Sequence, residues 1–198
     1  MGVEVMKYRS VLLFGAPGSG KGTQGRVLGA IPGFHYFAMG DAFRNLRRDG
    51  PMGQVFFDYS SRGLLVPDEF TLELWLRHVQ TSIAEGRFNP ECDTLVLDGI
   101  PRNLHQTRML QEKLEVKAVL HLTCADPQVL IDRLQRRAAI ENRPDDAHLE
   151  VIQKRLETYQ SQTRPVLDFY GPRLVHRIEC KEKPVCVLRE VLDVLVAL

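Results

Sequence analysis

The chain has 198 residues, of which 44% are hydrophobic and 26% are charged. A chain of this length and composition builds one domain with a sizeable core, which excludes an intrinsically disordered protein. Its 26 lysines and arginines nearly balance its 25 aspartates and glutamates, giving a net charge of +1. Binding to nucleic acid or membranes through bulk charge is therefore not expected, and an anionic ligand must be held by locally placed charges.

The cysteines and the N-terminus indicate the compartment. The chain has four cysteines (Cys92, Cys124, Cys180 and Cys186), with no Cys-x-x-Cys pair and no zinc-binding spacing. We therefore expect free thiols in a reducing compartment. No apolar run approaches the roughly 18 residues of a membrane span, and the N-terminal stretch MGVEVMKYRS lacks a secretory signal. These features predict a cytoplasmic protein.

Short apolar runs predict the strands in chain order. The first run, at 9–14, ends in a glycine-rich turn, and a weaker candidate covers 35–38. Later runs lie at 94–97, 116–123 and 173–178. Buried strands of a parallel sheet have this continuous apolar character.

Helical patterns lie between these runs. Asp68 is expected to cap one helix, Asp126 is expected to cap another that begins at Pro127, and 185–198 form an amphipathic terminal helix. Strands that alternate with helices predict an α/β fold whose parallel sheet is covered on both faces. The polar stretch 138–146 is the clearest candidate for a mobile loop.

The glycine-rich turn after the first strand predicts a phosphate-binding loop. Residues 15–23 read GAPGSGKGT; such glycines let backbone N–H groups turn toward phosphate oxygens, and the following helix presents its positive end. Lys21 supplies a mobile cation for the β- and γ-phosphates. Gly22 follows the lysine, so the hydroxyl arrives one residue late, at Thr23. Thr23 remains a candidate magnesium ligand, but the ion should also need phosphates, water and a carboxylate elsewhere.

Motifs along nearly the whole chain resemble those of the adenylate kinase family. They are GAPGSGKGTQ at 15–24, MGDAFR at 39–44, GLLVPDE at 63–69, LDGIPR at 97–102, an arginine-rich segment at 133–146 and RLETY at 155–159. The arginine-rich segment resembles the family's short lid, which lacks the zinc knuckle of long-lid relatives, so no structural zinc is expected.

The resemblance implies one P-loop kinase domain over 1–198, with a P-loop NTPase-type parallel sheet flanked by helices. Its core would comprise 1–37, 68–136 and 147–198, with a small helical NMP-binding lobe at about 38–67 and a short lid at about 137–146. The implied reaction is magnesium-dependent transfer of a phosphoryl group from ATP to AMP, giving two ADP. The implied partners are these nucleotides, with no nucleic acid or membrane, and the protein is expected to be a monomer.

The resemblance also assigns site residues. Phosphoryl transfer needs positive groups around the moving phosphate, and the planar fork of arginine holds phosphate oxygens well. For catalysis it implies Lys21, Arg102, Arg137, Arg143 and Arg155. For ATP binding it implies Gly18, Ser19, Gly20, Lys21, Gly22, Thr23, Arg133 and Lys183. For AMP binding it implies Met39, Arg44, Leu64, Leu65, Val66, Gly99, Ile100, Pro101, Arg102, Gln106, Arg143 and Arg155. Asp98, at the end of a predicted strand, resembles the carboxylate that orients the waters of Mg²⁺.

Two features leave the acceptor base open. Met39 stands where adenylate kinases usually have threonine, and Asn103 after LDGIPR is a residue that UMP/CMP kinases tend to share. Against these, Gln106 is the adenylate-type residue, whose amide offers a donor and an acceptor to adenine. We expect AMP, with a UMP/CMP kinase as the alternative. A non-catalytic nucleotide switch is a further alternative, but it would not need arginine clamps for two substrates.

Some charged residues have two interpretations. Asp41 either caps the helix before Arg44 or belongs to the site, and Asp145 and Asp146 either cap the helix at 149 or pair with lid arginines. Arg136 matches no motif and is expected on the surface.

Overall fold

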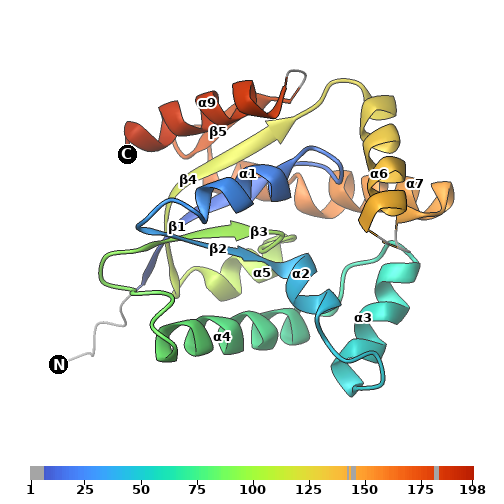
Figure 1. Ribbon diagram of the computed structural model, residues 1–198, viewed down its shortest axis with the longest axis horizontal. Helices are drawn as coiled ribbons and strands as arrows, with labels where there is room; N and C mark the ends of the chain where they lie inside the picture. Colours follow the sequence, from blue (N-terminus) through green and yellow to red (C-terminus); the bar gives the residue numbers. More distant parts are fainter. Residues whose placement is uncertain (1–6, 142, 144–145, 181–182) are drawn as a thin grey trace.

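One parallel sheet organises the protein. The computed structural model describes residues 7–141, 143, 146–180 and 183–198. Five strands pair in the order β2-β3-β1-β4-β5, all in parallel (Figure 1). They are β1 (Tyr8–Phe14), β2 (Phe34–Ala38), β3 (Thr94–Asp98), β4 (Leu114–Thr123) and β5 (Val175–Glu179). This confirms the predicted fold class and all the predicted strands, with β4 beginning two residues earlier and β5 two residues later than expected.

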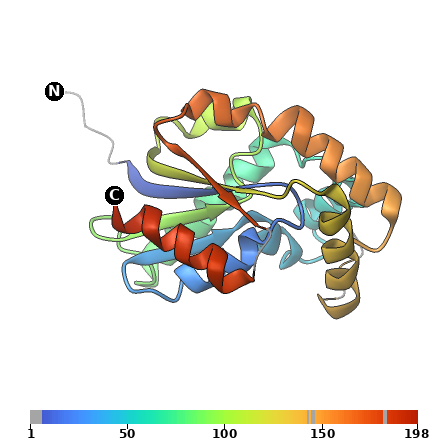
Figure 2. The same cartoon turned by 90° about the horizontal axis from the view of Figure 1, so that it is seen from above.

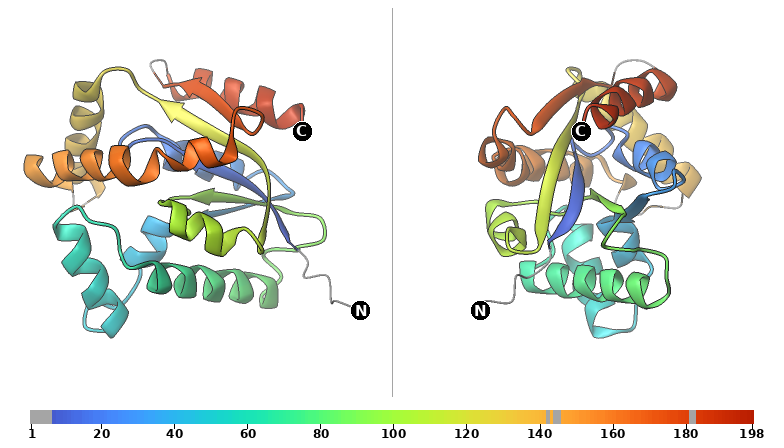
Figure 3. Two further views of the ribbon diagram at one scale, coloured as in Figure 1. Left: turned by 180° about the vertical axis from the view of Figure 1, so that it is seen from behind. Right: turned by 90° about the vertical axis from the view of Figure 1, so that its left-hand side faces the viewer.

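Helices cover both faces of the sheet, as the alternation of elements predicted. Successive side chains of a strand point to opposite faces, and β1 shows this directly. Val11 and Leu13 pack in one core with α1 (Lys21–Leu28) and α9 (Pro184–Val196), whereas Leu12 and Phe14 belong to the core on the other face. That second core is covered by α4 (Asp68–Ala84), α5 (Leu104–Leu110) and α8 (Val166–Tyr170) (Figure 3).

The remaining helices lie beyond the carboxyl ends of the strands. They are α2 (Met39–Arg44), α3 (Pro51–Ser61), α6 (Pro127–Glu141) and α7 (Leu149–Thr158), the last continuing into the π-helix η2 (Tyr159–Thr163). In Figure 2, α6 and α7 project from the end of the molecule that is opposite the two termini. The chain passes from β1 to β2 and β3 on one side and to β4 and β5 on the other. Open parallel sheets bind ligands at such a reversal of strand order.

Two helix boundaries differ from the sequence predictions. The expected loop at 138–146 is wrong for its first four residues, which continue α6 as far as Glu141; the sequence there is Ala-Ala-Ile-Glu, which favours helix. The expected capping role of Asp68 is also wrong, because Pro67 occupies the N-cap position of α4 and Asp68 lies in its first turn. Asp126 does accept a hydrogen bond from the Gln128 N–H at 2.9 Å, as predicted for α6. Among the described residues, no helix combines the length and apolar character needed to cross a membrane.

Candidate active site

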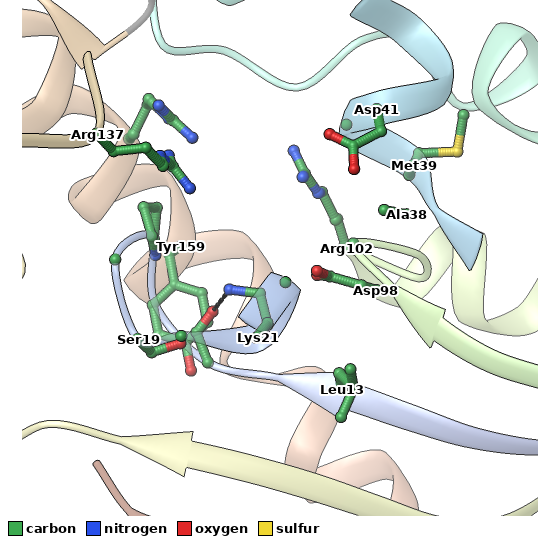
Figure 4. A pocket seen from close by; sticks show the side chains of 18 of the residues that line it. Leu13, Ser19, Lys21, Ala38, Met39, Asp41, Asp98, Arg102, Arg137 and Tyr159 are labelled. Atoms are coloured by element: carbon green, nitrogen blue, oxygen red, sulfur yellow. Dashed lines mark hydrogen bonds between the residues drawn. The ribbon is translucent and has the colours of Figure 1, made fainter. Parts of the chain in front are cut away.

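A cavity of about 600 Å³ lies at the carboxyl ends of β1 and β3. Its wall is formed by the glycine-rich loop, by residues of α2 and α3, and by residues of α6 and α7. Figure 4 shows Arg102 standing between Asp98 and Asp41, with Arg137 facing it across the cavity. Groups from segments far apart in the sequence are therefore brought to one place.

The glycine-rich loop is built for an anion. Gly15, Gly18 and Gly20 have φ values of 147°, 83° and 97°, which side chains of other residues rarely permit. A Cβ on Gly18 would also lie only 2.8 Å from the Leu130 carbonyl oxygen. Ser19 is 2% exposed, and its hydroxyl oxygen has no hydrogen-bond partner among the described residues. A buried unpaired hydroxyl in a glycine-rich loop before a helix fits a phosphate.

Lys21 occupies the centre of this loop. Its ammonium Nζ donates to the carbonyl oxygens of Gly15 and Ala16 at 2.7 and 3.1 Å. Burial lowers the pKa of Lys21 to about 8; nearby Asp98 opposes the shift, and Arg102 adds to it. A cation that is desolvated and surrounded by further cations gains strongly from an anionic ligand.

Asp98 ends β3 and is held by Tyr36 on the neighbouring strand. The Tyr36 hydroxyl donates to Asp98 Oδ2 at 3.1 Å. Burial, and then the charge of Asp98, raise the pKa of Tyr36, so the phenol remains a donor. The Tyr36 side chain fits here only because Gly25 and Gly29 have no Cβ. A Cβ on Gly25 would overlap the tyrosine ring, and one on Gly29 would lie 2.6 Å from the tyrosine Cβ. Sequence reasoning missed Tyr36; the signal was a pair of glycines four residues apart, Gly25 on the helix that follows the phosphate loop and Gly29 at its C-cap.

Two arginines, one from α6 and one from α7, share one buried carboxylate. Asp146 is fully buried, and its Oδ2 lies 2.6 Å from Arg137 Nη2. Arg155 pairs with the other carboxylate oxygen. Of the two alternatives for Asp146, pairing with lid arginines is confirmed, since His148 is the N-cap of α7. Asp145 lies outside the described residues.

Asp41 links the segment 38–67 to the arginine-rich segment. It lies in the first turn of α2, whose N-cap is Ala38, so the capping interpretation is wrong. One carboxylate oxygen of Asp41 is 2.6 Å from Arg44 Nη2 and 3.6 Å from Arg143 Nη2. Arg26 approaches the other oxygen at 3.8 Å. Arginines from three separate segments therefore converge on this carboxylate.

Comparison with known proteins agrees with this geometry. The family model described as "Adenylate kinase" matches residues 13–174. The chain belongs to the adenylate kinase family. Adenylate kinases similar to it include that of Cyanothece sp., 40% identical over 81% of this chain and 80% of the relative, and that of Thermobifida fusca, 38% identical over 85% and 88%. That of Streptomyces coelicolor is 32% identical over 81% and 85%. The predicted resemblance is confirmed, and the UMP/CMP kinase alternative is not favoured.

Most residues assigned by resemblance to adenylate kinases do line the cavity. On the donor side these are Gly18, Ser19, Gly20, Lys21, Gly22, Thr23, Asp98 and Arg133. On the acceptor side and around the junction they are Met39, Arg44, Leu64, Leu65, Val66, Gly99, Pro101, Arg102, Gln106, Arg137, Arg143 and Arg155. Ile100 is instead 1% exposed in the core that α4 covers, and Lys183 is the N-cap of α9; neither lines the cavity.

Two arginines that the motifs did not identify also line the cavity. They are Arg26 on α1 and Arg136 on α6. Arg136 has the exposed position that was expected for it, although it also lines the cavity. Single-motif matching could not have found either residue, since both depend on how the helices are placed.

The residues present fit a magnesium ion that arrives with its nucleotide. The described part of the chain contains no group of three or more His, Cys, Asp or Glu residues that could hold a metal by itself. Asp98 places one carboxylate on the same cavity wall as Lys21, and Thr23 lies on that wall too. Mg²⁺ is commonly held by one or two carboxylates together with substrate phosphates and water.

Proposed function

We propose that this chain catalyses the reversible, magnesium-dependent transfer of a phosphoryl group from ATP to AMP, giving two ADP. The observation that carries the proposal is one cavity in which the phosphate loop with Lys21 faces Arg44 and Arg102 from a different part of the fold. A protein that bound a single nucleotide would need the loop alone. Cationic groups on both sides of one cavity suit two polyanionic substrates held end to end.

The donor would bind with its phosphates in the glycine-rich loop. The backbone N–H groups and the unpaired Ser19 hydroxyl would receive oxygens, and Lys21 would leave its carbonyl partners for the β- and γ-phosphates. Arg133, whose Nη2 donates to the Cys180 carbonyl at 2.9 Å, would carry the adenine on its flat face. Asp98, held by Tyr36, would orient the waters of the magnesium ion. The ion supplies charge neutralisation for the phosphates.

The acceptor would bind on the opposite wall. Arg44 and Arg102 would hold its phosphate, and Gln106 would face its base. The AMP phosphate is already an anionic nucleophile, so the transfer would be direct and in line with no general base. Arg137, Arg143 and Arg155 would surround the transferring group and stabilise its charge. Asp146 would keep two of these guanidinium groups in place, and closure of the arginine-rich segment would exclude water.

The proposal extends to compartment and assembly. All four cysteines lie in the described residues and none of them forms a disulfide, which agrees with a reducing compartment. We place the reaction in the cytoplasm and expect the protein to act as a monomer.

The proposal is tested by ADP formation from ATP and Mg²⁺ with AMP, CMP, UMP and GMP offered separately. The expected result is turnover that requires an acceptor and is fastest with AMP. Faster turnover with CMP or UMP would overturn the acceptor assignment but keep the phosphate-binding roles. ATP binding without transfer to any acceptor would overturn the enzymatic function itself.

A further inference from the structure

Asp68 contacts three polar side chains at the N-terminus of α5. Its Oδ1 accepts from Asn103 Nδ2 at 2.9 Å and from Gln106 Nε2 at 2.7 Å. Its Oδ2 lies 2.8 Å from His105 Nδ1. Burial alone would raise the pKa of Asp68, but the hydrogen bonds from these three side chains outweigh it and lower the pKa. The residue is therefore an ionised acceptor, although sequence reasoning treated it as a helix cap.

The amide of Gln106 is held from both ends. Its Oε1 accepts from the Arg102 backbone N–H at 2.7 Å, while its Nε2 donates to Asp68. Rotating the amide by half a turn would place NH₂ against an N–H and an oxygen against a carboxylate. Gln106 is 1% exposed, on the cavity wall, so water cannot replace the lost bonds. The oxygen and nitrogen of this amide therefore have fixed positions.

A fixed amide presents a fixed pattern to a ligand. Oε1 keeps one lone pair and Nε2 keeps one N–H, because each has used its other bonding position on the protein. This pair matches a base edge with an amino group beside a ring nitrogen acceptor. Adenine and cytosine have that edge, whereas hypoxanthine, guanine and uracil present an oxygen beside a ring N–H. In a keto base, the ring N–H would face the Gln106 N–H, and the keto oxygen would face the Gln106 Oε1.

We propose that Asp68 is a positioning residue that sets acceptor specificity, by locking the Gln106 amide in the orientation that selects amino bases over keto bases. This inference rests on the proposed function in one respect, that Gln106 faces the acceptor base. Asp68 itself need not touch the nucleotide. Discrimination by paired and unpaired buried polar groups is larger than discrimination by shape alone.

The test uses two matched pairs of acceptors that differ mainly in the polarity of this edge. AMP is compared with inosine monophosphate, and CMP with UMP, as ratios of kcat/KM. The variants are Asp68→Ala, which removes the acceptor, and Asp68→Asn, which removes the charge but keeps an oxygen for Gln106 and Asn103. Glu69→Ala is the control, because it removes an exposed carboxylate from the same helical turn. Asp68→Leu replaces the alanine variant if the latter does not fold, and thermal unfolding is recorded for each protein.

In Asp68→Ala we expect the ratio of AMP to inosine monophosphate to fall about tenfold, mainly through a higher KM for AMP. The ratio in Asp68→Asn and in Glu69→Ala should stay within about threefold of the unmodified chain. An unchanged ratio in Asp68→Ala would overturn the proposal, and so would an equal loss in Asp68→Asn. If the unmodified chain did not use AMP, the proposed function would fail instead, and the ratio of CMP to UMP would still test the role of Asp68.

Discussion

The two halves of the cavity are built in different ways. The donor half, residues 15–23, is mostly backbone, with three glycines at positive φ and one lysine that bonds to carbonyls of the same loop. In the acceptor half, formed by α2, the start of α4 and the start of α5, side chains hold one another. Arg44 pairs with Asp41 at 2.6 Å, and Gln106 bonds to Asp68 at 2.7 Å.

This contrast has a consequence for function. A backbone loop needs no partner to keep its shape, so changes in the donor half should abolish turnover rather than redirect it. A side chain that depends on a neighbour can be weakened or reoriented through that neighbour. Changes in the acceptor half should therefore alter affinity and base selectivity while turnover persists.

The largest expected effect is that of Lys21→Ala. This variant should lower kcat by about a thousandfold, because it removes the cation that stabilises the negative charge of the phosphoryl group during transfer. Initial rates of ADP formation at saturating ATP and AMP measure the effect. Lys117→Ala is the matched control, since Lys117 pairs with Glu115 on β4 and does not line the cavity. A thousandfold loss in the control as well, or a loss below tenfold in Lys21→Ala, would contradict the role of the donor half.

Arg44→Ala should act on the acceptor instead. We expect the KM for AMP to rise about thirtyfold, with kcat changed less than about threefold, because a charge-assisted contact to one substrate is lost. The KM for ATP should stay unchanged. Arg47→Ala is the control, since the Arg47 side chain is 85% exposed and pairs with Asp49. If Arg44→Ala left the KM for AMP unchanged, the assignment of the acceptor half would be wrong.

The pH profile should report on Lys21. Its pKa of about 8 lies below the ordinary value of 10.5, and ATP needs the protonated form. We therefore expect kcat/KM for ATP to fall about tenfold per pH unit as the pH rises above about 8. The free energy of unfolding should change in the opposite direction. The unfolded chain keeps the Lys21 proton up to about pH 10.5, whereas the folded chain loses it above about pH 8, so this group makes the fold more stable as the pH rises between these two values. Lys21→Arg, which stays charged, should lack the descending limb; the same limb in that variant would assign it to another group.

The smallest expected effect is that of Tyr36→Phe. It keeps the ring between Gly25 and Gly29 but removes the hydrogen bond to Asp98. We expect kcat to fall about fivefold, and the gain in affinity that Mg²⁺ gives a non-hydrolysable ATP analogue to shrink by a similar factor. Calorimetric titration with and without Mg²⁺ measures the second quantity. Tyr170→Phe, at a tyrosine that does not line the cavity, should leave both unchanged. Full magnesium-dependent affinity in Tyr36→Phe would show that the hydroxyl does not position Asp98.

The same contrast explains which parts of the fold and of the site could be predicted from the sequence. The donor half was predictable because its shape depends on local backbone preferences, so a run of glycines followed by Lys21 identifies it. The strands were predictable because a buried parallel sheet produces continuous apolar runs. The acceptor half was predictable only as a set of residues. That Asp68 bonds to Gln106 across 38 positions, or Tyr36 to Asp98 across 62, depends on packing that no local pattern records.

Other misses have the same origin. Asp41 and Asp68 satisfy the local rule for a helix cap, but Ala38 and Pro67 occupy the N-cap positions and each aspartate lies inside the first turn. Ile100 sits within a motif, yet it points into the core rather than toward the cavity. A motif assigns a segment to a site, and only the packed structure decides which of its side chains reach it.

The central claim is that one cavity holds both substrates with their phosphates facing each other. The most direct measurement is calorimetric titration with a single ligand in which two adenosines are joined by five phosphates, followed by competition kinetics. We predict one molecule bound per chain and competitive inhibition against both ATP and AMP. Binding of two molecules per chain, or competition with ATP alone, would contradict a shared cavity.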